Sequence, residues 1–142
     1  MRPNLLHDNA RAGLYHLPAA RRKELSNLAA KGRLALLPVA ADRCRNVNEA
    51  LHEFGRTLGF PAWYGGNLDA LHDCLTDPDW HPKRGVVMLI TGLDAVHHGD
   101  PARFATLLAV LRSAAASRSA AGKALWILLD APAPGVLDLP EA

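Results

Sequence analysis

The chain has 142 residues, of which 49% are hydrophobic and 21% are charged, as is usual for a globular domain. Its formal net charge is only +2, which is too small to indicate a nucleic-acid-binding protein. Two cysteines, Cys44 and Cys74, are too few for a secreted disulfide scaffold, and no apolar run reaches the ~20 residues that a membrane helix needs. The N-terminus has no apolar signal-peptide region, so we expect a cytoplasmic protein with two buried, reduced thiols.

Hydrophobic periodicity and turn residues predict strands that alternate with helices. The predicted elements, in chain order, are a strand at 13–17, a helix at 19–31, a strand at 33–40, helices at 47–58 and 68–76, a strand at 85–93, a helix at 101–121 and a strand at 123–130. This alternation is typical of an α/β domain whose strands run parallel. We therefore predict a small parallel β-sheet of three to four strands packed with helices, the strand at 13–17 being the fourth.

Capping residues mark the ends of several predicted helices. Asn46 is predicted to cap the helix at 47–58, with Glu49 three residues on, as in a capping box. Asn67 and Asp100 are predicted to cap the next short helix and the long helix. Gly32 is expected to end the first helix, because glycine is the usual residue at that position.

The apolar positions predict one core between the helices and the sheet. Pro38 lacks a backbone N–H, which favours an edge position for its strand. The predicted core residues are Leu36, Leu51, Phe54, Leu58, Leu68, Leu71, Leu75, Val87, Leu89, Leu107, Leu111, Ile127 and Leu128.

The net charge conceals an acidic segment. Residues 60–82 contain no lysine or arginine but four aspartates, Asp69, Asp73, Asp77 and Asp79. This segment therefore carries −4, and the rest of the chain carries +6 to reach the total of +2. An asymmetry of this kind indicates a local negative surface on a chain that is basic elsewhere.

Two of these aspartates share one helix face. Asp69 and Asp73 are four residues apart, which places them one turn apart on the predicted helix. Leu68, Leu71 and Leu75 occupy the opposite side. Like charges at this spacing repel weakly, so core packing does not explain the pair; the alternative is an ordinary solvated face.

Aromatic residues precede the acidic helix in a glycine-containing loop. Trp63 and Tyr64 are followed by Gly65 and Gly66, and glycine lets a backbone adopt positive φ and approach a partner closely. Aromatic residues are enriched in protein interfaces. Although we expect one of the two rings to pack inward, rings beside carboxylates resemble an interface hot spot more than a catalytic site.

The run PAWYGGNLDALHDCLTD resembles the signature of the barstar family, which comprises intracellular inhibitors of barnase-like, guanyl-specific ribonucleases. The matching residues are Trp63, Tyr64, Gly65, Asn67, Leu68, Asp69, Ala70, Leu71, Asp73, Cys74, Leu75 and Thr76. The predicted order of strands and helices also follows that of the family. The resemblance covers residues 33–130 as a barstar-like domain, which leaves residues 1–32 as an N-terminal extension and residues 131–142 as a proline-rich tail.

The resemblance implies a function without catalysis or cofactor. Asp73 would enter the active site of a nuclease in place of substrate phosphate, because arginine and lysine that bind phosphate also bind carboxylate. Asp69 would meet a neighbouring basic group. The partner-binding residues implied are Trp63, Tyr64, Gly65, Asn67, Leu68, Asp69, Ala70, His72, Asp73 and Thr76. The expected partner is a cognate basic ribonuclease or toxin, with no direct contact to nucleic acid or membrane; the alternative is a barstar-like module that binds another basic protein or toxin, as an immunity protein does, without inhibiting a ribonuclease.

The chain departs from the family in two positions and in its charge. His72 stands where the signature has an aromatic residue. Ser113 falls where an acidic residue is expected late in the long helix. The slightly positive net charge implies weaker electrostatic steering of the whole molecule than in an acidic inhibitor.

Two other functions, an enzyme and a metal-binding protein, are disfavoured. An enzyme with Cys74 as nucleophile beside His72 and Asp73 is disfavoured, because neighbours on a helix point about 100° apart and do not converge. A metal site at His97 and His98, or at His81 near the acidic residues before it, is disfavoured because metal sites need three or four converging ligands.

Overall fold

The computed structural model describes residues 5–141 and confirms the predicted α/β fold. Four parallel strands form one sheet in the order β1-β4-β3-β2. The strands are β1 (Leu14–His16), β2 (Ala35–Ala40), β3 (Val86–Thr91) and β4 (Leu125–Leu129). The helices are α1 (Leu25–Lys31), α2 (Val47–Leu58), α3 (Leu68–Thr76), α4 (Leu93–Gly99) and α5 (Pro101–Ala120), with 3-10 turns at Leu5–His7, Asn9–Arg11, Ala19–Glu24 and Ala62–Tyr64.

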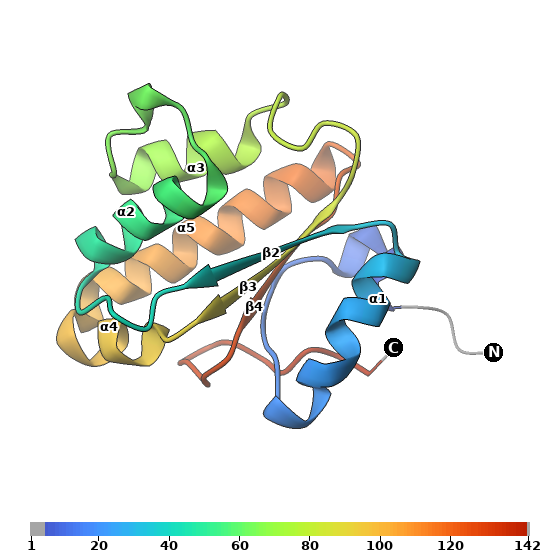
Figure 1. Ribbon diagram of the computed structural model, residues 1–142, viewed down its shortest axis with the longest axis horizontal. Helices are drawn as coiled ribbons and strands as arrows, with labels where there is room; N and C mark the ends of the chain where they lie inside the picture. The colour runs from blue at the N-terminus through green and yellow to red at the C-terminus, as the bar shows by residue number, and fades with distance from the viewer. Residues whose placement is uncertain (1–4, 142) are drawn as a thin grey trace.

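The helices cover the two faces of the sheet unequally. Helices α2 to α5 pack on one face, and α1 with the other N-terminal residues packs on the opposite face (Figure 1). None of the helices within residues 5–141 is long and apolar enough to cross a membrane.

Alternation along the strands supplies two separate cores. Val86, Met88 and Ile90 of β3 contribute to the core beneath α2 to α5, whereas Val87 and Leu89 point to the other face, because successive side chains of a strand point to opposite sides. The second core is closed largely by residues near the N-terminus, namely Leu5, Leu6, Leu17, Leu25 and Ala29. The prediction of one core was therefore incomplete.

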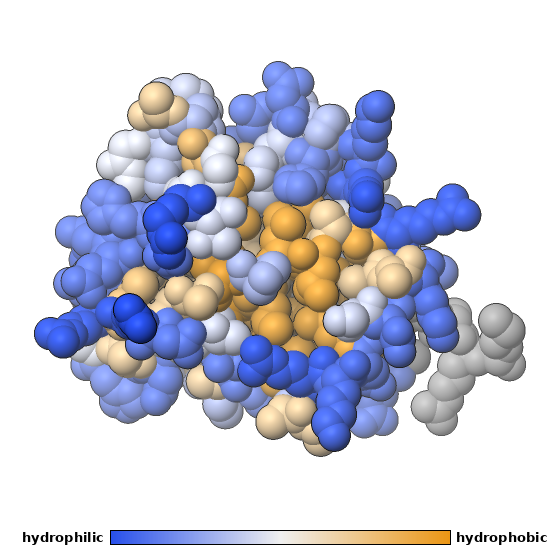
Figure 2. Space-filling model, in the orientation of Figure 1, coloured by the Kyte–Doolittle hydropathy of each residue, from blue (hydrophilic) through white to orange (hydrophobic). Residues whose placement is uncertain are grey.

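Strand β2 lies at an edge of the sheet, as Pro38 predicted. Proline has no backbone N–H, so at the edge of a sheet it leaves no unpaired donor and disfavours pairing with a further strand. Apolar side chains gather over β2 in the middle of this face, with hydrophilic ones around them (Figure 2). Leu36, predicted to be core, is only partly buried because its strand has a neighbour on one side alone.

Several predicted details are corrected. The helix expected from residue 19 begins as a 3-10 segment, and only Leu25–Lys31 is α-helical, because no residue of Ala19–Glu24 has a buried face to stabilise a longer helix. Gly32 follows the last residue of α1, as predicted, but the left-handed conformation is adopted by the next residue, Arg33, with φ +56°. Leu58 and Leu68 are partly buried at the periphery of the core.

The caps of α2 join it to α5. Asn46 Oδ1 accepts a hydrogen bond from the N–H of Glu49 (2.9 Å), as predicted. The Glu49 carboxylate accepts from Arg45 N–H (2.8 Å), one residue earlier than in a standard capping box. Asp100 does not cap its own helix with its side chain; its carboxylate accepts from Val47 N–H at the start of α2 (3.2 Å).

The C-terminal segment is tied to β1. His16 N–H donates to Leu137 O and Leu139 N–H donates to His16 O, both at 2.8 Å. The side chain of Leu139 is buried in the second core, and the guanidinium of Arg21 donates to the carbonyls of Leu139 and Pro140. The two ends of the described chain thus pack on the same face of the sheet.

Candidate protein-binding site

Helix α3 and the loop before it lie at the top of the molecule in Figure 1, on the layer outside α5. Asn67 Oδ1 accepts from Ala70 N–H (2.8 Å) and so caps the first turn, as predicted. Gly65 and Gly66 have φ near +66°, a conformation that glycine adopts without steric cost. The cap and the glycines therefore fix where the helix begins relative to the loop.

The two aspartates of α3 are exposed and lack a partner in the chain. Asp69 lies in the first turn, where the helix dipole favours a negative charge. Neither its carboxylate nor that of Asp73 forms a hydrogen bond or ion pair with any residue of the described part of the chain. Both carboxylates are accordingly free to meet an external cation.

The two rings of the loop point in different directions. Trp63 is 57% exposed, whereas Tyr64 is 6% exposed. The Tyr64 hydroxyl donates to Leu51 O at 2.8 Å, and burial, then the charge of Cys74, raises the pKa of Tyr64. Trp63 thus offers aromatic contact at the surface. Tyr64 is the ring that packs inward, as expected for one of the two, and it supports the loop from beneath because it fills the space over α2. Its contact with a partner stays a prediction.

Tyr64 packs where α2 has no side chain. A Cβ placed on Gly55 would lie 2.7 Å from two atoms of the Tyr64 ring, which is closer than van der Waals contact allows. Gly55→Ala should therefore destabilise the chain by about 1–3 kcal/mol through overpacking, although alanine favours a helix over glycine by about 1 kcal/mol. Thermal and urea unfolding would measure the change.

Repeating Gly55→Ala in a variant without the Tyr64 ring separates the effect of overpacking from that of helix propensity. In Tyr64→Ala, which removes the ring, the same Gly55→Ala change should become neutral or stabilising. An equal loss of stability in both backgrounds would mean that the ring is not the cause.

The other predicted contact residues are distributed between surface and interior. Gly65 and Asn67 are exposed, Leu68, His72 and Thr76 are partly buried, and Ala70 is buried at 7%. The Thr76 hydroxyl donates to His72 O (2.7 Å). His72 Nε2 lies 3.2 Å from Ser113 Oγ on α5, so the two positions that depart from the family signature are neighbours in space.

A buried arginine, which the sequence analysis missed, holds the C-terminal end of α3. Arg118 of α5 donates to Leu75 O (3.5 Å), Trp80 O (3.1 Å) and His81 O (3.4 Å), and its guanidinium lies 5.2 Å from the centre of the Trp80 ring. Burial lowers its pKa. Among residues 5–141 it forms no ion pair. Its charge is instead compensated by Leu75 O at the C-terminal end of α3, where the helix dipole is negative, and by two carbonyls of the following segment.

The helical spacing of the sequence could have shown that Arg118 lies on the buried face of α5. Arg118 continues the helical spacing of Leu107, Leu111 and Ala114, all of which are buried. A cation on such a face is rarely buried without partners, and the pattern could therefore have indicated an anchoring role.

Cys74 does not have the surroundings of a catalytic nucleophile. It is 2% exposed, and burial, followed by the charges of Asp77 and Asp73, raises the pKa of its thiol. A raised pKa reduces the thiolate that would react. Cys44 is also buried, and burial is again the main reason that the pKa of its thiol is raised.

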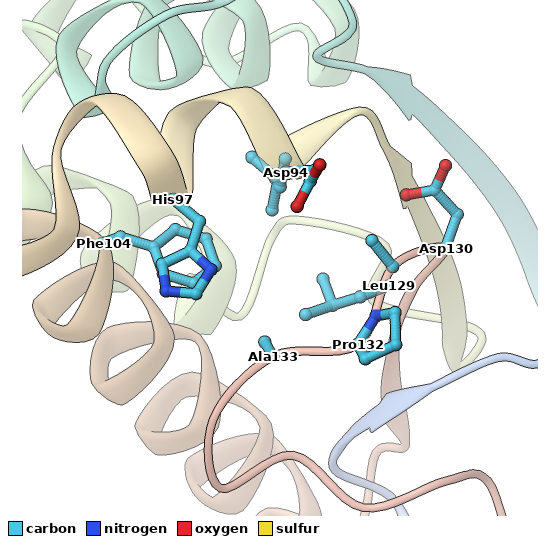
Figure 3. A pocket seen from close by; sticks show the side chains of 9 residues that line it. Asp94, His97, Phe104, Leu129, Asp130, Pro132 and Ala133 are labelled. Atoms are coloured by element: carbon cyan, nitrogen blue, oxygen red, sulfur yellow. The ribbon is translucent and has the colours of Figure 1, made fainter.

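The carboxyl ends of parallel strands are the usual site of ligands in α/β proteins, but the cavity here is very small. It has a volume of about 10 Å³ and lies between α4, α5 and the residues after β4, where the rings of His97 and Phe104 stack with centres 4.5 Å apart (Figure 3). The Asp130 carboxylate accepts from Gly92 N–H (3.1 Å). This space holds about one water molecule rather than a substrate.

The histidine pair lies in a helix. His97 and His98 belong to the last turn of α4, and His98 Nδ1 lies 3.5 Å from the carboxylate of Asp94. Within the described residues no group of three or more histidine, cysteine or acidic side chains is placed to hold a metal ion.

Comparison with known proteins identifies the family. A family model described as barstar, barnase inhibitor, matches residues 34–130, which include β2 to β4 and all of α2 to α5. No curated protein matches the chain. Because the family model spans more than half of the 142 residues, the chain belongs to the barstar family.

Proposed function

We propose that this protein inhibits a basic ribonuclease by inserting the acidic face of α3 and the Trp63 ring into its active site. The observation that carries the proposal is the pair of exposed carboxylates, Asp69 and Asp73, one helical turn apart and without a partner among residues 5–141. Membership of the barstar family supports it.

The chemistry of the acidic face suits a nuclease cleft. Ribonuclease active sites gather arginine and lysine for phosphate, and a carboxylate offers the same cations two oxygens in a bidentate geometry. Asp69 and Asp73 repel each other on the free protein, and cations of the partner would relieve that repulsion. The rigid helix keeps the loss of side-chain and backbone entropy on binding small.

A second candidate is a barstar-like immunity protein for a different basic toxin. It is favoured by the surface beside Asp73, where His72 and Ser113 lie 3.2 Å apart and where the family signature has an aromatic and an acidic residue. A partner with a different contact to this area would fit the altered surface, while Asp69 and Asp73 would act as before.

Affinity capture distinguishes the candidates. The wild-type chain and the Asp69→Ala/Asp73→Ala variant are immobilised, and proteins retained by each are identified and assayed for ribonuclease activity with and without added chain. We expect the wild type alone to retain a basic ribonuclease whose activity falls to zero at one equivalent of inhibitor. A basic partner without ribonuclease activity would support the second candidate, and equal retention by both baits would contradict both.

A further inference from the structure

A broad basic hollow lies at the amino ends of the strands, away from the acidic face of α3. The amino ends of β2 and β3 are at the right of Figure 1, beside the end of α1. The hollow has a volume of about 440 Å³, within the usual range of roughly 300–1,000 Å³ for small-molecule sites. Its lining residues are Asn9, Gly32, Arg33, Leu34, Pro82, Lys83, Arg84, Gly85, Gly122, Lys123 and Ala124.

The charge of this hollow is of one sign. Four cations, Arg33, Lys83, Arg84 and Lys123, line it, and no carboxylate does. In the part of the chain that the structure describes, none of the four side chains forms a hydrogen bond or an ion pair. Like charges that line one hollow repel one another, and a bound anion would relieve that repulsion.

His81 precedes the lining residue Pro82. Burial and then the charges of Arg118 and Arg84 hold the pKa of His81 below its ordinary value, which favours its neutral form.

The backbone around the hollow is held in an uncommon conformation. Arg33 has φ +56° and His81 φ +46°, the two non-glycine residues with positive φ among those described. Such conformations cost energy and occur preferentially where a ligand is bound. Arg33 lines the hollow directly.

Contacts from distant segments close one side of the hollow. Asn9 donates from its side-chain amide to Gly122 O (3.4 Å), and the Ser119 hydroxyl donates to Asn9 O (2.8 Å). The N-terminal segment is thereby fixed to the end of α5, and the hollow is formed by the folded chain as a whole rather than by one mobile loop.

We propose that this hollow binds a phosphate-bearing anion of about nucleotide size, with two or more phosphate groups. Arginine and lysine are the side chains that bind phosphate most strongly, and four of them match the charge of such a ligand. No aromatic residue lines the hollow, whereas sites for single-stranded nucleic acid use aromatic rings on which bases stack. The composition therefore favours a small polyphosphate over a polynucleotide.

The test is calorimetric titration of the full chain with inorganic tripolyphosphate and, separately, with ATP, in buffer of low ionic strength. We expect both probes to bind at one site per chain and to raise the melting temperature, with weaker binding as salt is added. Stronger binding of ATP would show that the base and sugar also make contacts, and equal binding would assign the affinity to phosphate alone.

Charge-matched variants locate the site. Lys83→Gln/Lys123→Gln should weaken tripolyphosphate binding at least about tenfold. Arg22→Gln/Lys23→Gln, in the 3-10 segment that precedes α1 and outside the lining of the hollow, should leave it within about twofold. Arg84→Gln provides a second test within the hollow. Circular dichroism confirms that each variant is folded.

Three results would overturn the proposal. These are no saturable binding by wild type, equal loss in the two double variants, and tighter binding of a short RNA oligomer than of either small probe. Since the titrations use the chain alone, their outcome is independent of whether a ribonuclease is inhibited.

Discussion

Asp73→Ala is expected to weaken binding of the captured partner by at least ~2 kcal/mol, about 30-fold or more in Kd, as removal of a hot-spot residue does. The reason is that the exposed carboxylate has no partner in the described chain, and basic groups of the partner that it would neutralise would be left buried and unpaired. Surface plasmon resonance or calorimetry would measure the change in Kd.

The matched control is Asp79→Ala. Asp79 lies in the same acidic segment, beyond the end of α3. Asp79→Ala therefore removes one negative charge, as Asp73→Ala does, but leaves the acidic face of α3 unchanged. We expect a change of no more than about 0.5 kcal/mol in binding and no change in melting temperature for either variant. Equal effects of the two substitutions would mean that the partner senses overall charge and not the position of Asp73.

Deletion of residues 1–31 is expected to abolish cooperative folding. Four leucines of this segment, Leu5, Leu6, Leu17 and Leu25, are buried in the second core. At about 1.5–3 kcal/mol for each buried leucine, their loss amounts to roughly 6–12 kcal/mol, comparable with the typical stability of about 5–15 kcal/mol. It would also uncover Trp126, which has no exposed surface in the intact chain.

Point variants keep this prediction measurable if the truncated chain is insoluble. Leu25→Ala should destabilise the full chain by about 2–5 kcal/mol, and Ser26→Ala, at the exposed neighbouring position, by no more than about 0.5 kcal/mol. A truncated chain that unfolds cooperatively at the wild-type temperature would show that residues 32–142 fold without the N-terminal segment. The division of the chain into an extension at residues 1–32 and a domain that begins at residue 33 stays a prediction drawn from the family resemblance.

The sequence predicted the sheet and the acidic helix well because their signals are local. β-branched and apolar runs identified β3 and β4, and Asn67 with the leucines after it identified α3. Pro38 marked an edge strand through its missing N–H. These features depend on neighbours within one turn or one strand.

The failures concern contacts between distant segments. Asp100 has the residue type of a helix cap, but its carboxylate serves α2, more than fifty residues earlier. Trp63 and Tyr64 are adjacent and both aromatic, so the sequence predicted that one ring packs inward but not which one. The Tyr64 ring occupies the space that a side chain at Gly55 would fill. Arg118 lies on a buried helix face, but its partners, the carbonyls of Leu75, Trp80 and His81, are 37 to 43 residues away in the sequence.

The pairing of β1 with β4 determines when the fold can be completed during synthesis. Leu14 is aligned with Ile127, so the first strand emerges from the ribosome long before its neighbour exists. Until β4 is translated, the leucines of the N-terminal segment lack the strand that completes their core, and the pairing has the high contact order of slow-forming structure. Nascent chains of this protein should consequently acquire protease resistance only once β4 has left the ribosome.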